Sequence, residues 1–218
     1  MRSIKLCSRC QLRLDLCLCS QAPSLSVSSQ NLKLILLTHP DEPRKPSNTG
    51  RLLEAALPLC DLWLWERAEF EAQWRQFLST QSRTPILLFP DEPVDSSRVD
   101  DSPAKNSQLT ALHQINTPDI DNSVYILLDA TWQQAKKMLR KAPSLQACQR
   151  LSLSSLVKSR YTLRKNQQAG SFSSVESGVG LLRELELEDD ALAVEGYFER
   201  FLVHSEANRS GYHLDENQ

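Results

Sequence analysis

The sequence predicts an α/β fold: a parallel β-sheet flanked by helices, preceded by a small cysteine-bearing knuckle. Three apolar runs, at 32–37, 86–89 and 124–128, are continuous rather than alternating, which is typical of strands buried on both faces of a parallel sheet. Helical patterns lie between these runs, and this order of strands and helices favours an α/β sandwich. The knuckle is indicated by four cysteines within thirteen residues near the N-terminus.

The cysteine cluster comes first along the chain and has the pattern C-x2-C-x6-C-x-C, formed by Cys7, Cys10, Cys17 and Cys19. Four thiolates at this spacing can enclose a tetrahedral zinc ion, and C-x2-C is the usual first half of such a site. Because four protein ligands leave no open position, the metal would be structural and would fold a segment too short to make its own core. Four unligated thiols or a redox pair are the alternatives.

A Ser-rich stretch at 20–30 follows the cysteines and is interpreted as a linker. It divides the chain into a knuckle, a main domain and a tail, at 1–22, 30–206 and 207–218. Helices are expected after the strands, at 51–57, 70–78 and 131–141, and as a pair across 175–204 broken near Asp189. Residues 91–123 are rich in Asp, Ser, Pro and Asn; this is long for a connection, so we expect a surface excursion there.

Length and composition indicate one globular domain of ordinary size, since the 218 residues are 40% hydrophobic and 24% charged, unlike disordered or fibrous chains. No apolar run approaches the roughly 18 residues that suggest a membrane span. The basic N-terminus has no apolar stretch behind it, so we expect a cytoplasmic protein without a membrane partner. The absence of G-x-G-x-x-G, Walker, H-E-x-x-H and G-x-S-x-G motifs leaves the enzyme classes built on them unsupported.

Charge is unevenly distributed along the chain, although the net charge is only −2. Between Asp129 and Glu176 there is no acidic residue but there are nine lysines and arginines, so this stretch carries +9 and the rest of the chain −11. A stretch of this kind can present a face that binds a polyanion. Solvated helix faces that lack acidic residues are the alternative interpretation.

Polar segments follow all three predicted strands. Residues 38–51 follow the first, 90–92 follow the second, and Asp129, Thr131 and Trp132 follow the third. Ligands of open α/β sheets bind at the carboxyl ends of the strands, so we expect these segments to form the site. Asp129 also precedes a helix start, and capping that helix is its alternative role.

Taken together, these segments resemble the DTW-domain family. The resemblance extends from about Cys7 to the C-terminal helices and is carried by the cysteines, Thr38-His39-Pro40-x-Glu42, Asn48-Thr49-Gly50, Asp129-x-Thr131-Trp132, Ser159-x-Tyr161-x-Leu163-Arg164-Lys165 and Ser174-x-Glu176. It is strongest to the bacterial tRNA-uridine aminocarboxypropyltransferases. It implies a SPOUT-like fold with a C-terminal knot, and transfer of the 3-amino-3-carboxypropyl group of S-adenosylmethionine to N3 of a tRNA variable-loop uridine. The excursion at 91–123 has no place in the family pattern.

Roles for individual residues follow from this chemistry. The uridine imide must lose its proton, and Asp129 is the best placed general base. Thr131 and Trp132 complete the expected catalytic set, with a helix cap as the alternative for Thr131 and packing in an apolar helix stripe as the alternative for Trp132. The residues expected to bind S-adenosylmethionine are His39, Glu42, Asn48, Pro90, Asp129, Ser174 and Glu176. Stabilising the turn of its loop is the alternative role for His39. The residues expected to meet tRNA phosphates are Lys136, Lys137, Arg140, Arg160, Arg164 and Lys165.

Two other functions stay open at this point. An RNA methyltransferase of the SPOUT type would use the same co-substrate but transfer a different carbon, so the mass of the product distinguishes it. A non-enzymatic zinc-knuckle protein would bind RNA without binding S-adenosylmethionine.

Overall fold

The fold was analysed on a computed structural model that describes residues 5–89, 119–153 and 172–211. Within these ranges five parallel strands form one sheet in the order β2-β1-β4-β3-β5. The strands are β1 (Lys33–Thr38), β2 (Cys60–Leu64), β3 (Thr84–Leu88), β4 (Ser123–Asp129) and β5 (Gln149–Leu151). The predicted parallel sheet flanked by helices is therefore confirmed, and the three apolar runs form β1, β3 and β4.

Strands β2 and β5 were not predicted, because neither has a continuous apolar run. β2 is an edge strand, and after the buried Cys60 its burial alternates: Asp61 and Trp63 are partly buried, whereas Leu62 and Leu64 are exposed. β5 contains only three residues and lies at the opposite edge. Edge strands are covered less completely than central ones, so the signal from two-sided burial is weak there.

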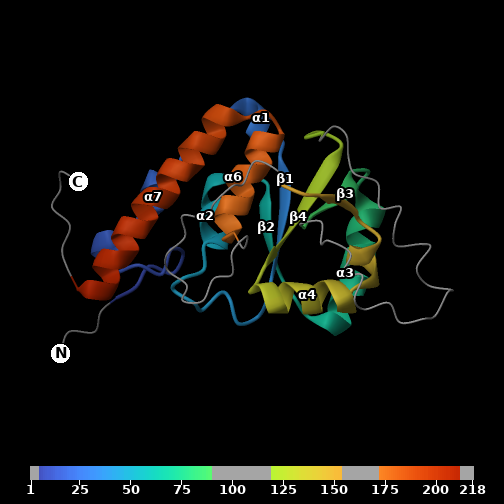
Figure 1. The fold of residues 1–218 in the computed structure, drawn as a ribbon, viewed down its shortest axis with the longest axis horizontal. Helices are drawn as coiled ribbons and strands as arrows, with labels where there is room; N and C mark the ends of the chain where they lie inside the picture. The colour runs from blue at the N-terminus through green and yellow to red at the C-terminus, as the bar shows by residue number, and fades with distance from the viewer. Residues whose placement is uncertain (1–4, 90–118, 154–171, 212–218) are drawn as a thin grey trace, which may run out of the picture.

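Helices cover both faces of the sheet (Figure 1). Helices α2 (Gly50–Ala56), α6 (Ser174–Glu184) and α7 (Glu188–Ser210) pack on one face, and α3 (Arg67–Thr80), α4 (Trp132–Lys141) and α5 (Pro143–Gln146) on the other. Successive residues of β1 serve the two cores alternately, with Leu34 and Leu36 on the α2 face and Ile35 and Leu37 on the α4 face, as the pleat of a strand requires. The break between helices predicted near Asp189 lies earlier, at 185–187, and Asp189 is in the first turn of α7.

The N-terminal segment packs against α7 through an apolar core that it shares with the sheet. Leu16 and Leu18 are buried in the same cluster as Tyr197 and Phe201 of α7. The Tyr197 hydroxyl donates a hydrogen bond to the carbonyl oxygen of Leu18 at 3.3 Å. Short 3-10 turns at Leu14–Leu16 and Cys19–Gln21 carry this segment. The knuckle is thus held against α7 by tertiary packing.

The Ser-rich stretch predicted as a linker includes a short helix, α1 (Val27–Gln30), that is fastened to α7. The backbone N–H and hydroxyl of Ser26 donate to the carboxylate of Asp190 at 2.9 and 2.5 Å, and the hydroxyl of buried Ser29 donates to the same carboxylate. Burial raises the pKa of Asp190, but these hydrogen bonds outweigh it and leave the pKa lowered. The serines of this stretch therefore have a structural use that their composition did not reveal.

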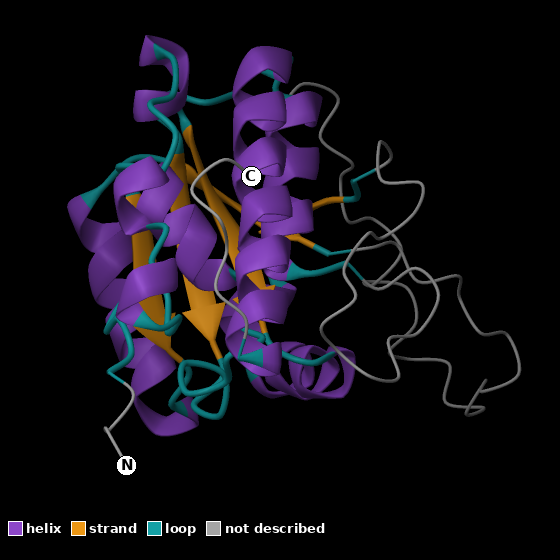
Figure 2. Ribbon diagram, turned by 90° about the vertical axis from the view of Figure 1, so that its left-hand side faces the viewer, coloured by secondary structure: helices purple, strands orange, loops and turns teal. Residues whose placement is uncertain are grey.

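After the parallel strands β1 and β4, the chain turns to opposite faces of the sheet. The chain leaves β1 through α2 on one face of the sheet and leaves β4 through α4 on the other. Figure 2 shows the helices standing in front of the strands when the molecule is viewed from the α7 side. A sheet with such a divergence opens a crevice beyond the strand ends, where ligands bind. Register places Thr38 opposite Asp129 at this crevice.

Some predictions concern parts of the chain outside the described ranges. The predicted excursion at 91–123 falls almost entirely on them, and the predicted knot in part, so both stay predictions. Among the described residues, no helix combines the length and hydropathy needed to cross a membrane.

Candidate functional site

Asp129 is the last residue of β4 and is buried at the carboxyl end of the sheet, with only 1% of its surface exposed. Its Oδ2 atom accepts a hydrogen bond from Asn48 Nδ2 at 2.6 Å, and its Oδ1 atom accepts one from the Ser174 hydroxyl at 2.5 Å. A buried carboxylate is costly unless hydrogen bonds satisfy it. The structure therefore brings together three predicted site residues from three distant segments and fixes the orientation of the carboxylate.

Gly50 allows helix α2 to approach Asp129 closely. A Cβ atom at position 50 would lie 2.8 Å from Asp129 Oδ2 and 3.0 Å from its Cγ, which is closer than a side chain can be placed without displacing the carboxylate. The neighbouring Thr49 hydroxyl accepts a hydrogen bond from the backbone N–H of Val175, at the start of α6, at 3.3 Å. The Asn48-Thr49-Gly50 motif thus joins the β1–α2 loop to both β4 and α6.

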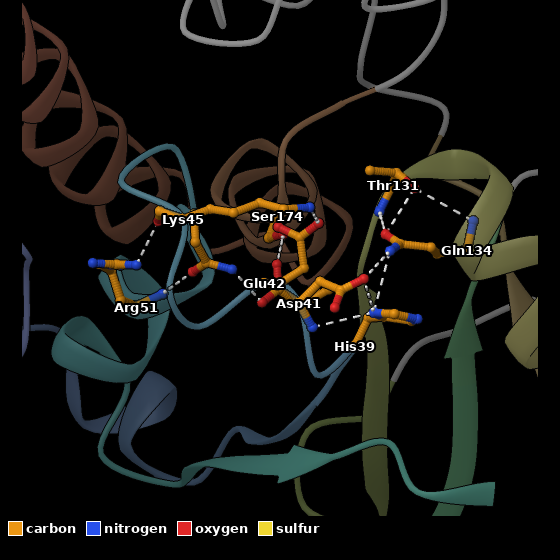
Figure 3. Close-up of polar contacts among 10 residues, drawn as sticks. His39, Asp41, Glu42, Lys45, Arg51, Thr131, Gln134 and Ser174 are labelled. Carbon is orange, nitrogen blue, oxygen red and sulfur yellow. Dashed lines mark hydrogen bonds and ion pairs between the residues drawn. The ribbon is translucent and has the colours of Figure 1, made fainter.

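Thr131 is the N-cap of α4 and forms a capping box with Gln134 (Figure 3). The Gln134 Oε1 atom accepts hydrogen bonds from the Thr131 backbone N–H at 3.0 Å and from its hydroxyl at 2.8 Å. On its other side, Gln134 Nε2 lies 3.2 Å from His39 Nδ1 and 3.1 Å from Asp41 Oδ2. The structure thus shows the capping alternative for Thr131, and it links the loop after β4 to the loop after β1.

The loop after β1 also carries a partly buried ion pair. The side chain of Glu42 is fully buried, and its Oε1 atom lies 2.8 Å from Lys45 Nζ. The Arg51 guanidinium donates to the carbonyl oxygens of Pro43 and Lys45, at 3.3 and 2.8 Å, and holds the loop to the start of α2. Figure 3 shows these side chains together with Ser174. Glu42 was predicted as a site residue, whereas Lys45 was not, because nothing in the sequence marks it out from other loop lysines.

Trp132 packs against the sheet on the α4 face. Its ring stacks on Phe89 with centroids 5.1 Å apart and an interplanar angle of 18°, and Lys136 Nζ lies 4.9 Å from the Trp132 ring centroid. Trp132 is also packed against the cluster that contains Ala135 and Met138. This is the packing that the apolar-stripe alternative describes, with a cation–π contact added.

The remaining predicted residues differ in what the structure shows of them. Lys137 and Arg140 are exposed on α4. Glu176 forms a capping box at the start of α6, where its carboxylate accepts from the Ser173 backbone N–H and hydroxyl, both at 2.8 Å. It thereby fixes the turn that carries Ser174. Pro90, Arg160, Arg164 and Lys165 lie outside the described residues.

Gln134 is a second site residue that the sequence analysis missed, yet a local signal for it existed. It stands three residues after Thr131, and Thr-x-x-Gln before an amphipathic helix is a capping-box pattern. That pattern predicts the contact with Thr131. It does not predict the contact with His39, which lies 95 residues away in the sequence.

The four N-terminal cysteines form a compact cluster, with all four Sγ atoms within 4.8 Å of one another. The Sγ atoms of Cys7 and Cys19 are 3.7 Å apart, as are those of Cys10 and Cys17. A tetrahedral zinc ion with Zn–S bonds of about 2.3 Å places its sulfur ligands about 3.8 Å apart. Two sulfur pairs therefore have the separation expected at a tetrahedral metal site, and all four sulfur atoms lie close enough to surround one ion.

The protonation of the cysteine cluster is tuned by its backbone. A hydrogen bond from the backbone N–H of Cys10 lowers the pKa of the Cys7 thiol to about 6, whereas burial raises the pKa of Cys10 and of Cys19. By contrast, Cys60 and Cys148 are buried apart from the cluster, and burial raises the pKa of both thiols. Backbone N–H groups aimed at sulfur are suited to a ligand that binds as a thiolate.

Comparison with known proteins identifies the family. A DTW domain model matches residues 4–205. The chain is 28% identical over 205 residues to tRNA-uridine aminocarboxypropyltransferase A of Arabidopsis thaliana, covering 84% of this chain and 73% of that protein. It is 24% identical over 186 residues to tRNA-uridine aminocarboxypropyltransferase 2 of Drosophila melanogaster, covering 83% of this chain and 66% of that protein. It is 28% identical over 186 residues to the protein of that name from Macaca fascicularis, covering 83% of this chain and 56% of that protein. This chain thus spans from just over half to about three quarters of the length of these relatives. No solved structure gives a significant match. Since the DTW domain model covers nearly the whole chain, this protein belongs to the DTW domain family.

Proposed function

We propose that this protein transfers the 3-amino-3-carboxypropyl group of S-adenosylmethionine to N3 of a variable-loop uridine in tRNA. The observation that carries the proposal is the buried Asp129 carboxylate at the carboxyl ends of the two central strands, oriented by Asn48 and Ser174. The names of the relatives, tRNA-uridine aminocarboxypropyltransferases, support this choice of reaction. A carboxylate on a rigid mount suits a reaction that begins with removal of the imide proton.

In the proposed reaction Asp129 takes the proton from uridine N3. The nitrogen electron pair forms a new N–C bond with the methylene carbon next to the sulfonium of the co-substrate. The C–S bond breaks, its electrons neutralise the sulfur, and methylthioadenosine leaves; the proton passes from Asp129 to solvent. Asn48 and Ser174 each donate a hydrogen bond to one oxygen of the Asp129 carboxylate. These donors orient the Asp129 carboxylate. The orientation of the reacting groups decides which carbon next to the sulfonium of S-adenosylmethionine is attacked.

The loop after β1 has the charge pattern to hold the amino-acid part of the co-substrate. A carboxylate and an ammonium group, Glu42 and Lys45, lie 2.8 Å apart there, and the methionine moiety offers an ammonium and a carboxylate in return. Glu42 would face the ammonium and Lys45 the carboxylate, with charge-assisted hydrogen bonds on both. His39, Asn48 and Ser174 border the same region, Glu176 acts by fixing the turn of Ser174, and Pro90 stays a prediction for this site.

We place the tRNA on the α4 side of the site. Lys137 and Arg140 are exposed along α4, and Lys136 lies over the Trp132 ring. Contacts of such residues with phosphates position the RNA, while an unstacked loop base enters the crevice. Arg160, Arg164 and Lys165 are predicted to extend this basic surface.

The cysteine cluster is proposed to hold one structural zinc ion through Cys7, Cys10, Cys17 and Cys19, since the donor set and its spacing fit tetrahedral coordination. The cluster takes no part in the transfer. We further propose the division into a knuckle at 1–22, a catalytic domain at 30–206 and a tail at 207–218, and a cytoplasmic location.

The test is the mass of nucleosides from tRNA that has been incubated with the full chain and S-adenosylmethionine. The proposal requires a uridine enlarged by one aminocarboxypropyl group and an equal amount of methylthioadenosine. A methylated nucleoside with S-adenosylhomocysteine would instead establish a methyltransferase. Binding of tRNA without any modified nucleoside or co-substrate binding would indicate an RNA-binding protein.

A further inference from the structure

The contact between Gln134 and His39 determines which ring nitrogen of His39 carries a proton. Resting on the proposed function, we propose that Gln134 is a positioning residue: it holds His39 with the proton on Nε2, so that the imidazole donates a hydrogen bond to a carbonyl oxygen of the target uracil. Asp129 and His39 then have complementary roles, one accepting a proton and the other donating a hydrogen bond.

The orientation of the Gln134 amide is set by Thr131. The backbone N–H of Thr131 can only donate, and it lies 3.0 Å from Gln134 Oε1, which the Thr131 hydroxyl also contacts at 2.8 Å. The reversed amide would place N–H against N–H. The carbonyl oxygen therefore faces Thr131, and the NH2 group faces His39 and Asp41.

The Nδ1 atom of His39 consequently faces two donors. Gln134 Nε2 lies 3.2 Å from it, and the backbone N–H of Asp41 donates to it at 3.3 Å. The second hydrogen of the Gln134 amide is directed to Asp41 Oδ2, at 3.1 Å. Asp41 Oδ2 is also 3.3 Å from His39 Nδ1, but the Asp41 side chain is 66% exposed, so solvent weakens its pull on a proton at Nδ1. Two donors at one nitrogen require its lone pair, which leaves the proton of the neutral ring on Nε2.

His39 is anchored beside the base. Its backbone N–H donates to the carbonyl oxygen of Asp129 at 3.0 Å, which places both residues at the same edge of the sheet. Uracil N3 lies between two carbonyl groups, and loss of its proton spreads negative charge onto their oxygens. A fixed N–H donor at that point stabilises the charge as it develops. A donor also matches the C4 carbonyl of uracil and opposes the C4 amino group of cytosine.

The decisive variant is Gln134→Glu. Glutamate serves as well as glutamine in a capping box, so Thr131 and the start of α4 keep their contacts. The second carboxylate oxygen replaces the NH2 group and turns a donor toward His39 into an acceptor, so the ring proton is expected on Nδ1. Gln133→Glu is the matched control, since it makes the same change at the neighbouring, exposed position of α4.

The measurement is long-range proton–nitrogen NMR on the full chain without substrate, which distinguishes protonated from unprotonated ring nitrogens. The His39 signals are assigned by their loss in His39→Gln. We expect protonated Nε2 in the wild type and in Gln133→Glu, and protonated Nδ1 in Gln134→Glu. We also expect the transfer rate of Gln134→Glu to fall about 10- to 100-fold, with Gln133→Glu within about twofold of the wild type.

The outcomes separate this inference from the proposed function. Protonated Nδ1 in the wild type would overturn the inference, whether or not the protein modifies tRNA and whether or not the variant folds. An unchanged tautomer in folded Gln134→Glu would overturn the role of Gln134. If the tautomer shifts and transfer stays at the wild-type rate, the donor role of His39 is wrong although the proposed reaction stands. An inactive wild type with protonated Nε2 would refute the proposed reaction and leave the assignment of the His39 proton intact.

Discussion

The cysteine cluster and the Asp129 site are assembled in opposite ways. The four cysteines lie within thirteen residues of the chain, and one short segment brings their sulfur atoms within 4.8 Å of one another. The partners of Asp129 come from far away: Asn48 is 81 residues before it and Ser174 is 45 residues after it. The cluster therefore depends on local geometry and, under the proposed zinc site, on a metal ion, whereas the Asp129 site depends on the sheet that brings its segments together.

This difference predicts different consequences of mutation. The knuckle segment shares its core with α7, so damage to the cluster is expected to reduce the stability of the fold. Asp129 ends a buried central strand, and its donors Asn48 and Ser174 lie at the starts of helices α2 and α6, so changes there are expected to reduce the rate of transfer more than they reduce stability.

The largest effect is expected for Asp129→Asn. The amide cannot accept the uridine proton, so the transfer rate should fall about 10²–10⁴-fold. Folding should be retained, because the new NH2 group can donate to the Ser174 hydroxyl while the remaining oxygen accepts from Asn48. Single-turnover kinetics with tRNA measure the rate, and binding of tRNA and S-adenosylmethionine should persist. Transfer near the wild-type rate would mean that Asp129 only supports the structure and that the base lies elsewhere.

Gly50→Ala should produce the next largest effect, through displacement of the Asp129 carboxylate. The new Cβ atom would lie 2.8 Å from Oδ2, and a shift of about 1 Å in a catalytic group can cost about 10²-fold in rate. Overpacking should also lower the free energy of unfolding by about 1–3 kcal/mol.

The control for this variant is Gly196→Ala in α7, where the nearest atom to a new Cβ is Arg200 Nη1 at 3.8 Å. This variant should be as stable as the wild type or more stable by up to about 1 kcal/mol, with unchanged transfer. Equal behaviour of the two variants would show that the close approach of α2 to Asp129 has no functional weight.

Cys7→Ser tests the other region of the comparison. We expect about one zinc ion per chain in the wild type and a large loss in the variant. The free energy of unfolding should fall by at least about 2 kcal/mol, which lowers Tm by about 4–8 °C in a chain of this size. Elemental analysis and thermal unfolding measure the two effects.

The matched control is Cys148→Ala, which removes a buried thiol outside the cluster and should keep the zinc. Less than about 0.2 zinc per chain in folded, metal-supplemented wild-type protein would contradict the proposed site. Cys7→Ser should also retain part of the wild-type transfer rate, in contrast to Asp129→Asn.

The smallest effects are expected for charge reversal of exposed basic residues on α4 and on the N-terminal knuckle. Lys137→Glu and Arg140→Glu alter exposed residues of α4, and each should weaken tRNA binding several-fold and reduce its salt dependence by about one phosphate contact. Arg9→Glu changes an exposed residue of the knuckle and should have a weaker effect if α4 is the main contact.

Arg200→Glu, an exposed position of α7, serves as the charge control for these variants. Titrations at several salt concentrations measure all four. A larger loss from Arg9→Glu than from Lys137→Glu would move the proposed RNA surface from α4 to the knuckle.

Much of the central architecture could be predicted, because its signals are local or strong. The apolar runs identified β1, β3 and β4 since all three are covered on both faces. β2 escaped prediction because its position at the edge leaves Leu62 and Leu64 exposed. The stretch at 20–30 looked like a linker because serine is common in linkers, whereas its hydroxyls are needed by Asp190, more than 160 residues away.

The sequence by itself determined the cysteine spacing, the position of Asp129 after a buried strand, the capping pattern of Thr131 and Gln134, and the basic stretch without acidic residues. Each of these is a relation among residues a few positions apart, which backbone geometry converts directly into structure. Only the tertiary structure decided that Asn48, Gly50 and Ser174 surround Asp129, and that Gln134 faces His39. Those contacts depend on the order and register of the parallel strands, because the residues that meet come from segments far apart in the sequence. The chain leaves β1 and β4 on opposite faces of the sheet. No short-range pattern carries that information, because it is set by how whole helices and strands bury their apolar surfaces.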